Sequence, residues 1–215
     1  MMESQRHLRI SVTTLDSFNN YLNGGLNEDE LIAILKGEFK GNFYTERGTA
    51  LHKIIEDNIT TQIPITDKDG VDIYEYNDYI FDKAGIDKLA NYIDHRCIPE
   101  LKNFKEYSID GITLRIVGKA DFWTPYSIIE IKSTSFFNPE IYEESYQWRF
   151  YMDIFNVKEV LYIVATLKEK DGIHYIDSIN KAVKLWYESI PAEIEDLLSA
   201  FIQYLKAKDL LWIYS

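Results

Sequence analysis

Asp121, Glu130 and Lys132 lie in two neighbouring segments near the middle of the chain. The first segment is Gly118-Lys119-Ala120-Asp121, and the second, after a short turn, contains Glu130-Ile131-Lys132. Two carboxylates can hold a hard divalent cation through oxygen. A neighbouring ammonium can orient a water molecule and offset negative charge that develops on phosphorus. These residue types at this spacing therefore predict metal-dependent cleavage of a phosphodiester bond.

The two segments are expected to form a β-hairpin. Thr113–Trp123 and Ser127–Lys132 have strand-like patterns, and the proline in Thr124-Pro125-Tyr126-Ser127 favours a turn between them. If Pro125 and Tyr126 are the two loop residues, Asp121 lies directly opposite Glu130. Opposed Cβ atoms in such a pair are ~4.5–5.5 Å apart.

The hydrophobic pattern supports the same register. In it Ile129 and Ile131 join the apolar face of the first strand, while Glu130 and Lys132 join its polar face. The apolar face of the first strand consists of Ile112, Leu114, Ile116, Gly118, Ala120 and Phe122. An ordinary amphipathic hairpin would show the same alternation, but like charges opposed across two strands destabilise them. The opposed acids therefore favour a functional site.

Composition restricts the class of protein. The chain has 215 residues, of which 46% are hydrophobic, and this favours one globular domain with a core of about 45–170. No apolar run is long enough to span a bilayer, and the first residues show no signal-peptide core, so we expect a cytoplasmic protein. Cys97 is the only cysteine, which excludes an internal disulfide and a cysteine-based metal cluster.

The net charge of −12 opposes tight, non-specific binding of duplex DNA by a monomer. The stretch from Arg96 to Lys132, however, contains six basic and five acidic residues and is nearly neutral. The excess of acidic residues therefore lies elsewhere in the chain.

The remaining pattern predicts the elements that position these residues. An N-terminal strand at Arg9–Val12 is followed by a helix whose start, Thr13-Thr14-Leu15-Asp16, resembles a capping box. Asn138-Pro139-Glu140 begins a helix that extends to Asn156 with Ile141, Trp148, Met152 and Phe155 on its apolar side. The apolar run Val160–Ala165 is typical of a strand buried on both faces. Other helices are expected at Glu28–Leu35, at Thr45–Asn58, over most of Tyr79–Phe104 and at Pro191–Lys206. Other strands are expected at Lys105–Ile109 and within His174–Glu188. A loop or small hairpin is expected at Thr60–Asp78, with a turn at Asp67-Lys68-Asp69-Gly70.

Five motifs in order resemble the PD-(D/E)XK nuclease superfamily, in particular its RecB-like and phage-type exonuclease branch. They are Gly48-Thr49-Ala50-Leu51-His52, Glu106, Gly118-Lys119-Ala120-Asp121, Glu130-Ile131-Lys132 and Gln147-Trp148-Arg149-Phe150-Tyr151. The proline that usually precedes the catalytic aspartate is absent. The resemblance implies a restriction-endonuclease-like α/β fold, with a mixed central β-sheet flanked by α-helices and with the N-terminal helices and the C-terminal helix packed on it.

The resemblance also implies roles for individual residues. His52, Asp121, Glu130 and the carbonyl of Ile131 would bind Mg²⁺ or Mn²⁺, and Lys132 would position the attacking water. Gln147 and Tyr151 would lie near the scissile phosphate or order Lys132. Glu106 would be a further ligand or a partner of Lys119. Arg47 and Lys119 are candidate contacts for DNA phosphates, although a surface arginine is an equal alternative for Arg47.

We therefore predict a Mg²⁺- or Mn²⁺-dependent deoxyribonuclease that acts on DNA in recombination or repair, an exonuclease more than an endonuclease. DNA is the expected partner, together with a homo-oligomeric ring or a recombination protein. Two alternatives stay open, a non-catalytic nucleic-acid-binding or assembly subunit and a structure-specific endonuclease. Closed circular DNA separates endonuclease from exonuclease because it has no ends.

Overall fold

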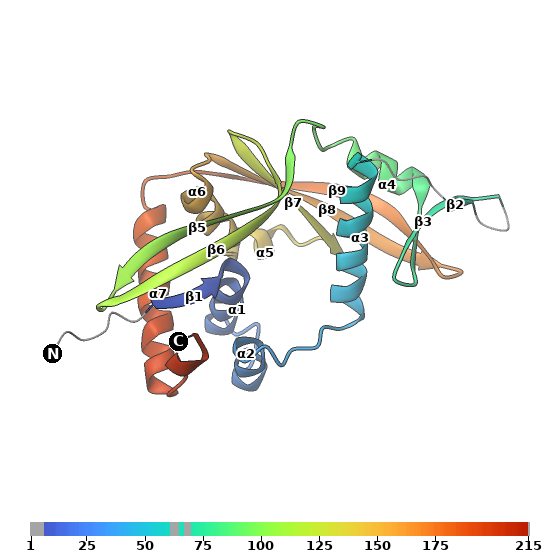
Figure 1. Cartoon of the computed structure of the whole chain (residues 1–215). Helices are drawn as coiled ribbons and strands as arrows, with labels where there is room; N and C mark the ends of the chain where they lie inside the picture. The colour runs from blue at the N-terminus through green and yellow to red at the C-terminus, as the bar shows by residue number, and fades with distance from the viewer. Residues whose placement is uncertain (1–6, 61–64, 67–69, 215) are drawn as a thin grey trace.

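The computed structural model describes residues 7–60, 65–66 and 70–214. A mixed β-sheet carries helices on both faces (Figure 1), which confirms the predicted fold class. The helices are α1 (Val12–Leu22), α2 (Glu28–Leu35), α3 (Phe43–Thr60), α4 (Lys83–Ala90), α5 (Pro139–Glu144), α6 (Gln147–Phe155), α7 (Ile190–Ala207) and the 3₁₀ helix η1 (Leu211–Tyr214). The strands are β1 (His7–Ser11), β2 (Ile65–Thr66), β3 (Asp72–Tyr76), β4 (Tyr79–Asp82), β5 (Ile98–Ile109), β6 (Ile112–Trp123), β7 (Ser127–Thr134), β8 (Glu159–Lys170) and β9 (Ile173–Leu185).

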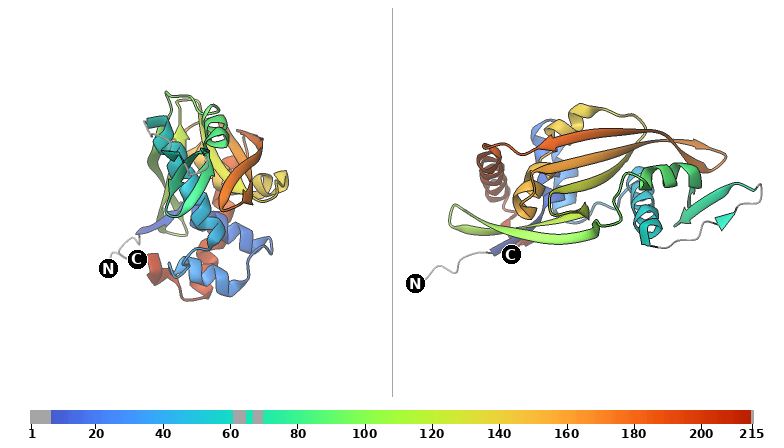
Figure 2. Two further views of the ribbon diagram at one scale, coloured as in Figure 1. Left: turned by 90° about the vertical axis from the view of Figure 1, so that its right-hand side faces the viewer. Right: turned by 90° about the horizontal axis from the view of Figure 1, so that it is seen from above.

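The strand order is β1-β6-β7-β8-β9-β4-β3-β2, with β5 also paired to β6. The pairs β1–β6, β7–β8 and β4–β9 are parallel, and the others are antiparallel. The sheet curls along its length, so the β5–β6 hairpin and the β2–β4 segment lie at opposite ends of the molecule (Figure 2). As predicted, residues 160–165 lie in a buried strand, β8. It runs parallel to β7, with α5 and α6 forming the connection between them.

Strand β6 has an incompletely paired edge. Along one edge it pairs with β5 over nearly its whole length. Its other edge pairs with β1 at residues 113–117 and with β7 at residues 122–123. Residues 118–121 therefore have no strand partner on that edge within the described part of the chain, and their backbone groups need other partners.

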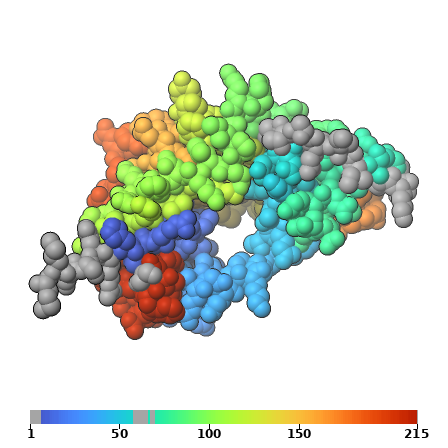
Figure 3. Space-filling model, in the orientation of Figure 1, coloured from blue at the N-terminus to red at the C-terminus, as the bar shows by residue number. Residues whose placement is uncertain are grey.

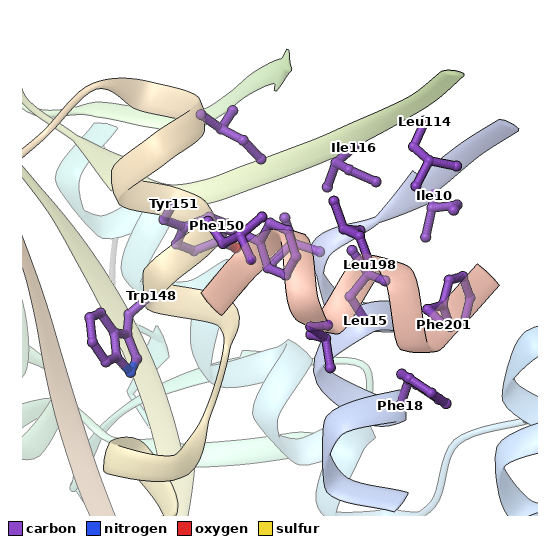
Figure 4. Close-up of a cluster of buried hydrophobic side chains, with 14 of the residues drawn as sticks. Ile10, Leu15, Phe18, Leu114, Ile116, Trp148, Phe150, Tyr151, Leu198 and Phe201 are labelled. Carbon is purple, nitrogen blue, oxygen red and sulfur yellow. The ribbon is translucent and has the colours of Figure 1, made fainter. Parts of the chain in front are cut away.

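Two hydrophobic cores lie on opposite faces of the sheet. The first joins α1, α6 and α7 to the sheet and contains Leu15, Phe18, Phe150 and Phe201 (Figure 4). The second joins α3 and α4 to the sheet and contains Leu51, Ile54 and Phe81, among others. Each buried side chain of this size contributes about 1.5–3 kcal/mol relative to exposure. Both layers therefore hold the sheet, and α3 and α6 approach it from opposite sides.

Two predicted helices are wrong in part. The segment Tyr79–Phe104 contains only the short helix α4, flanked by β4 and by β5, which starts at Ile98. The predicted helix from Asn138 to Asn156 breaks at Ser145 and Tyr146 into α5 and α6. Ile141, expected in the core, is 61% exposed on α5. In both cases pairing or packing with distant segments overrides the local periodicity.

The other elements follow the prediction closely, and the turn expected at Asp67–Asp69 lies outside the described residues. None of the helices in the described residues combines the length and hydrophobicity needed to cross a membrane.

Candidate active site

The hairpin formed by β6 and β7 has the predicted register. Phe122 pairs with Ile129 and Trp123 pairs with Ile128, which is the alignment that places Asp121 opposite Glu130. The backbone ladder stops at this point. Instead, the Asp121 N–H donates to Glu130 Oε1 at 3.1 Å, and the Ile131 N–H donates to Asp121 Oδ2 at 2.8 Å. Each acid therefore accepts a hydrogen bond from the opposite strand.

The faces of the hairpin differ from the prediction in one respect. Glu130 is 1% exposed and does not lie on an open polar face. Phe122 and Ile131 pack in the second core, whereas Ile116 and Ala120 pack in the first. The apolar side of β6 therefore packs in the first core up to Ala120 and in the second core from Phe122. Asp121 and Glu130 lie at this boundary between the two cores.

Lys132, Gln147 and Tyr151 hold Glu130 and the open edge of β6. Lys132 Nζ and Gln147 Nε2 donate to Glu130 Oε2 at 3.0 and 3.2 Å. Gln147 Nε2 also donates to the Tyr151 hydroxyl at 2.9 Å, and that hydroxyl donates to the carbonyl of Lys119 at 2.7 Å. This chain joins β7, α6 and β6 and brings together four of the predicted site residues.

Helix α3 brings His52 to the acids from the other side. His52 Nδ1 lies 3.4 Å from Asp121 Oδ1. One turn earlier, a Cβ added at Gly48 would lie 3.3 Å from Ser133 Oγ, closer than most real contacts. Glycine at this position therefore lets α3 approach the end of β7 and places His52 beside Asp121.

The environment shifts the pKa of each charged group. Burial raises the pKa of Glu130, and the charge of Asp121 raises it further, to about 7. Burial also acts to raise the pKa of Asp121, but His52 and Lys132 outweigh it, so this pKa is lowered. Burial acts to lower the pKa of His52 and of Lys132, yet the neighbouring carboxylates leave both pKa values raised. The site therefore combines crowded acids with two groups that favour positive charge.

The donor types fit a hard divalent cation. His52 and Asp121 line one small hollow together with Glu56 and Glu100. Imidazole and carboxylate donors suit Mn²⁺ and Mg²⁺. As the side chains lie, the described residues contain no three His, Cys, Asp or Glu groups placed to hold an ion together. Both oxygens of Glu130 and one of Asp121 also accept hydrogen bonds from N–H groups. Binding would require these bonds to loosen.

Glu106 does not lie at the site. Its carboxylate binds Arg115 Nε and Nη2 at 3.0 and 2.8 Å on the exposed part of the hairpin. The acid on β5 that reaches the site is Glu100, which falls between the Pro99–Phe122 and Leu101–Ala120 pairs of the β5–β6 register. It lines the same hollow as Asp121 and forms an ion pair with Lys119. Glu100 has a φ of 56°, a strained conformation for a non-glycine residue and one often found at functional sites. Knowing the β5–β6 register would have identified it from the sequence.

Arg47 is not placed to bind a DNA phosphate. It is 5% exposed, and its guanidinium lies 5.4 Å from the ring centroids of Phe43 and of Tyr44. Burial lowers its pKa. Lys119 remains exposed beside Glu100.

Asp16 was expected in a capping box of the first helix, but it contributes to the site in another way. It does not complete a capping box, since Ser11 caps α1. Instead, its Oδ1 accepts hydrogen bonds from the Tyr146 N–H, the Gln147 N–H and the Ser145 hydroxyl. Asp16 thereby caps α6 from another helix and fixes the first residue of that helix, Gln147.

A cleft of about 560 Å³ borders the site. It is lined by α1, α5 and the end of β7, and both Lys132 and Gln147 reach it. Figure 3 shows the surface hollowed between the α1–α2 pair and α3, beneath β6 and β7. Lys132 therefore lies between the buried acids and an open cleft that could admit a substrate.

The fold is similar to that of solved structures at low sequence identity. The crystal structure of SSO0001 matches with a TM-score of 0.53 and 14% identity, over 94% of this chain and 79% of that one. A phage related exonuclease from Haemophilus somnus 129PT matches with a TM-score of 0.45 and 12% identity, over 88% of this chain and 78% of that one. An alkaline exonuclease from Laribacter hongkongensis matches with a TM-score of 0.47 and 17% identity, over 93% of this chain and 89% of that one. No protein-family model and no curated protein matches the sequence.

Proposed function

We propose that this chain is a Mg²⁺- or Mn²⁺-dependent deoxyribonuclease of the PD-(D/E)XK superfamily that degrades DNA from an end. The observation that carries the proposal is the interlocked pair of Asp121 and Glu130, with Lys132 on one side and His52 on the other. A structural hairpin gains nothing from opposing two acids, because the repulsion costs stability. In a cation-binding site, the bound cation offsets the repulsion between the two carboxylates.

The ligands in this proposal are His52, Asp121, Glu130 and the carbonyl of Ile131. Glu100 and Glu56 are further donors in the same hollow. A divalent cation bound there would lower the pKa of a bound water and offset charge on the phosphoryl oxygens.

Lys132 would position the attacking water. The attraction of Glu130 and Asp121 exceeds the effect of burial and raises the pKa of Lys132. Nζ is held 3.0 Å from Glu130 Oε2 at the border of the cleft. From there it can donate to a phosphate oxygen or to the attacking water and hold either in position.

Gln147 and Tyr151 are positioning residues. Gln147 donates to the same Glu130 oxygen as Lys132 and is itself held by the Tyr151 hydroxyl. They limit the movement of Glu130 when its other hydrogen bonds loosen.

The proposed enzyme acts in the cytoplasm, in DNA recombination or repair. Its partner is a ring of further copies of this chain or a recombination protein.

The test is hydrolysis of end-labelled linear DNA and of closed circular DNA with Mg²⁺ or Mn²⁺, and with EDTA as the metal-free control. Wild type should release nucleotides from linear DNA and leave circular DNA intact. Lys132→Ala should lower the rate by roughly 10²–10³, the usual cost of losing one donor to a developing charge. Lys168→Ala, at an exposed lysine on β8, is the matched control and should keep the wild-type rate.

The other outcomes separate the alternatives. Cleavage of circular DNA would indicate an endonuclease. Wild type that is inert with both cations would favour a non-catalytic binding subunit. A Lys132→Ala variant with the wild-type rate would remove Lys132 from the mechanism.

A further inference from the structure

The outer face of β5, β6 and β1 is uncovered and starts at the candidate site. Along β6 the residues on this face are Thr113, Val117, Lys119 and Asp121, together with Arg115. Their neighbours on β6 that point the other way, such as Leu114, Ile116 and Ala120, are buried in the first core. Alternation along a strand therefore leaves one continuous polar face. In Figure 3 the surface of the β5–β6 hairpin lies open beside α3.

Basic residues from all three strands align on this face. The strand register places Lys102 beside Lys119, and places Arg9 beside Arg115. All four side chains belong to exposed residues. Three acids share the face. Glu100 is paired with Lys119 and Glu106 with Arg115, and Asp121 lies beside His52 at the end of the face. Among the described residues, Arg9 and Lys102 have no carboxylate partner. The face is thus net positive in a chain whose net charge is −12.

An aromatic platform lies among these charges. Phe104 is 49% exposed, and the guanidinium of Arg115 lies 4.5 Å from its ring centroid. Phe104 pairs with Val117, between the Lys102–Lys119 and Glu106–Arg115 pairs. Cationic side chains interleaved with an exposed aromatic ring are the features with which proteins bind nucleic-acid strands.

We propose that this face binds the sugar-phosphate backbone of the DNA strand that leads to the active site. The inference rests on the proposed function and extends it by naming the substrate surface. From Arg115 to Asp121 is six residues, or ~20 Å at ~3.3 Å per residue. This length corresponds to about six nucleotides at 3.4 Å each. The same phosphate chemistry is offered by single-stranded and by duplex DNA, and the experiment distinguishes them.

The test measures DNA binding by full-length protein in EDTA, where no cleavage occurs. Fluorescence anisotropy would follow labelled single-stranded and duplex 20-mers between 50 and 200 mM NaCl. The face variant carries Arg9→Gln, Lys102→Gln and Arg115→Gln. The matched control carries Lys168→Gln, Lys170→Gln and Lys208→Gln, which removes the same charge from exposed positions elsewhere.

The face variant should weaken binding at least tenfold at 100 mM NaCl. Its slope of log K against log salt should be shallower by about 2 for a single strand or about 2.7 for duplex, for three lost contacts at ~0.7 or ~0.9 each. The control should keep the wild-type slope. The DNA form with the larger loss is the one that occupies the face. Equal losses in both variants, wild-type binding by the face variant, or no binding by wild type would each overturn the proposal.

A second substrate separates this proposal from the proposed function. The p-nitrophenyl ester of thymidine 5′-phosphate is too short to span the ~20 Å from Asp121 to Arg115 and Arg9. A variant with only Arg9→Gln and Arg115→Gln should therefore hydrolyse it at the wild-type rate. If wild type cleaves neither the ester nor DNA, the proposed function fails, and anisotropy still decides the role of the face. If the triple variant does not fold, Lys102→Glu alone, at an exposed strand position, should weaken binding roughly tenfold by charge reversal.

Discussion

At the scale of single residues, the candidate site uses side chains where a strand partner is missing. The Lys119 carbonyl and the Asp121 N–H lie on the edge of β6 between its pairings with β1 and β7. The Tyr151 hydroxyl donates a hydrogen bond to the Lys119 carbonyl, and the Glu130 carboxylate accepts one from the Asp121 N–H. The interruption of the sheet therefore creates the space in which two acids meet without leaving buried backbone groups unpaired.

Gln147→Leu should lower DNA hydrolysis by roughly 10- to 100-fold, the usual cost of losing a residue that orients a metal-binding carboxylate. Leucine cannot donate to Glu130 Oε2, so the carboxylate would be free to turn. Steady-state kinetics should show the loss in kcat and little change in KM.

Tyr151→Phe is the matched control for that substitution. It keeps the bond between Gln147 and Glu130 but leaves the Lys119 carbonyl unpaired, at a stability cost of about 1 kcal/mol. Its kcat should fall less than that of Gln147→Leu. A larger fall would show that Tyr151, and not Gln147, controls Glu130.

At the scale of elements, the start of α6 depends on a residue of α1. Tyr146 provides no side-chain cap for α6. Asp16 instead accepts the N–H groups of Tyr146 and Gln147 at 2.7 and 3.2 Å. The carboxylate also lies at the positive end of the helix dipole. The orientation of Gln147 therefore depends on how α1 packs against α6.

Asp16→Ala should reduce the free energy of unfolding by about 0.5–2 kcal/mol, the range for loss of a helix cap. It should also lower kcat, because the first residue of α6 is Gln147. Urea denaturation and DNA hydrolysis would measure the two effects. Asp16→Asn keeps the accepting oxygen and should recover most of both, and failure to do so would show that charge matters more than capping.

The junction of α3, β4 and β9 contains a buried histidine, His174, which is 3% exposed. Burial lowers its pKa, and the Arg47 guanidinium lowers it further, while Glu169 acts in the opposite direction. Tyr79 stacks on the ring at 6.0 Å. The folded protein therefore resists protonation of His174 at a pH where the unfolded chain accepts the proton.

The contribution of His174 to stability should fall as the pH drops below about 6.5, where the unfolded histidine becomes protonated. This loss should continue until the pH reaches the lower folded pKa, at about 1.4 kcal/mol per pH unit. The unfolding free energy of His174→Leu should therefore rise relative to that of wild type as the pH falls from about 7 to about 5, because Glu130 and His52 titrate in both proteins. His95→Leu, at a side chain that is 89% exposed, should not. Equal pH dependence in all three proteins would contradict the assignment.

At the scale of the whole molecule, one sheet is shared by two cores. Residues of β7 and β8 contribute alternately to both, since Ile128 and Val160 belong to the first core while Ile131 and Ile163 belong to the second. Loss of either core would expose a face of the same strands. We therefore expect the two layers to unfold together.

Ile54→Ala should lower stability by about 2–5 kcal/mol through the cavity that it leaves in the second core. Trp148 lies in the first core and Trp123 packs against it, so tryptophan fluorescence reports mainly on the opposite layer. The fluorescence transition and the far-UV circular dichroism transition should shift together. A fluorescence transition that stays in place would show that the α3–α4 layer unfolds alone.

The sequence by itself determined the hairpin and the residues it carries. A proline-containing turn and strict alternation specify the register between Phe122 and Ile129, and these signals are local. The helix at Glu28–Leu35 was also predicted with its observed bounds, and the structure shows that a local capping box of Asn27 and Glu30 fixes its start.

The tertiary structure alone decided which distant groups join that hairpin. It selected Glu100 instead of Glu106, since the register of β5 on β6 pairs Glu106 with Arg115 and leaves Glu100 beside Asp121 in the same hollow. It extended β5 back to Ile98, so that residues 98–104 form a strand where the local pattern favoured a helix, and it made Asp16 the cap of α6. The physical reason is that strand pairing and capping between separate elements depend on contacts far apart in the chain, which periodicity and turn residues do not encode.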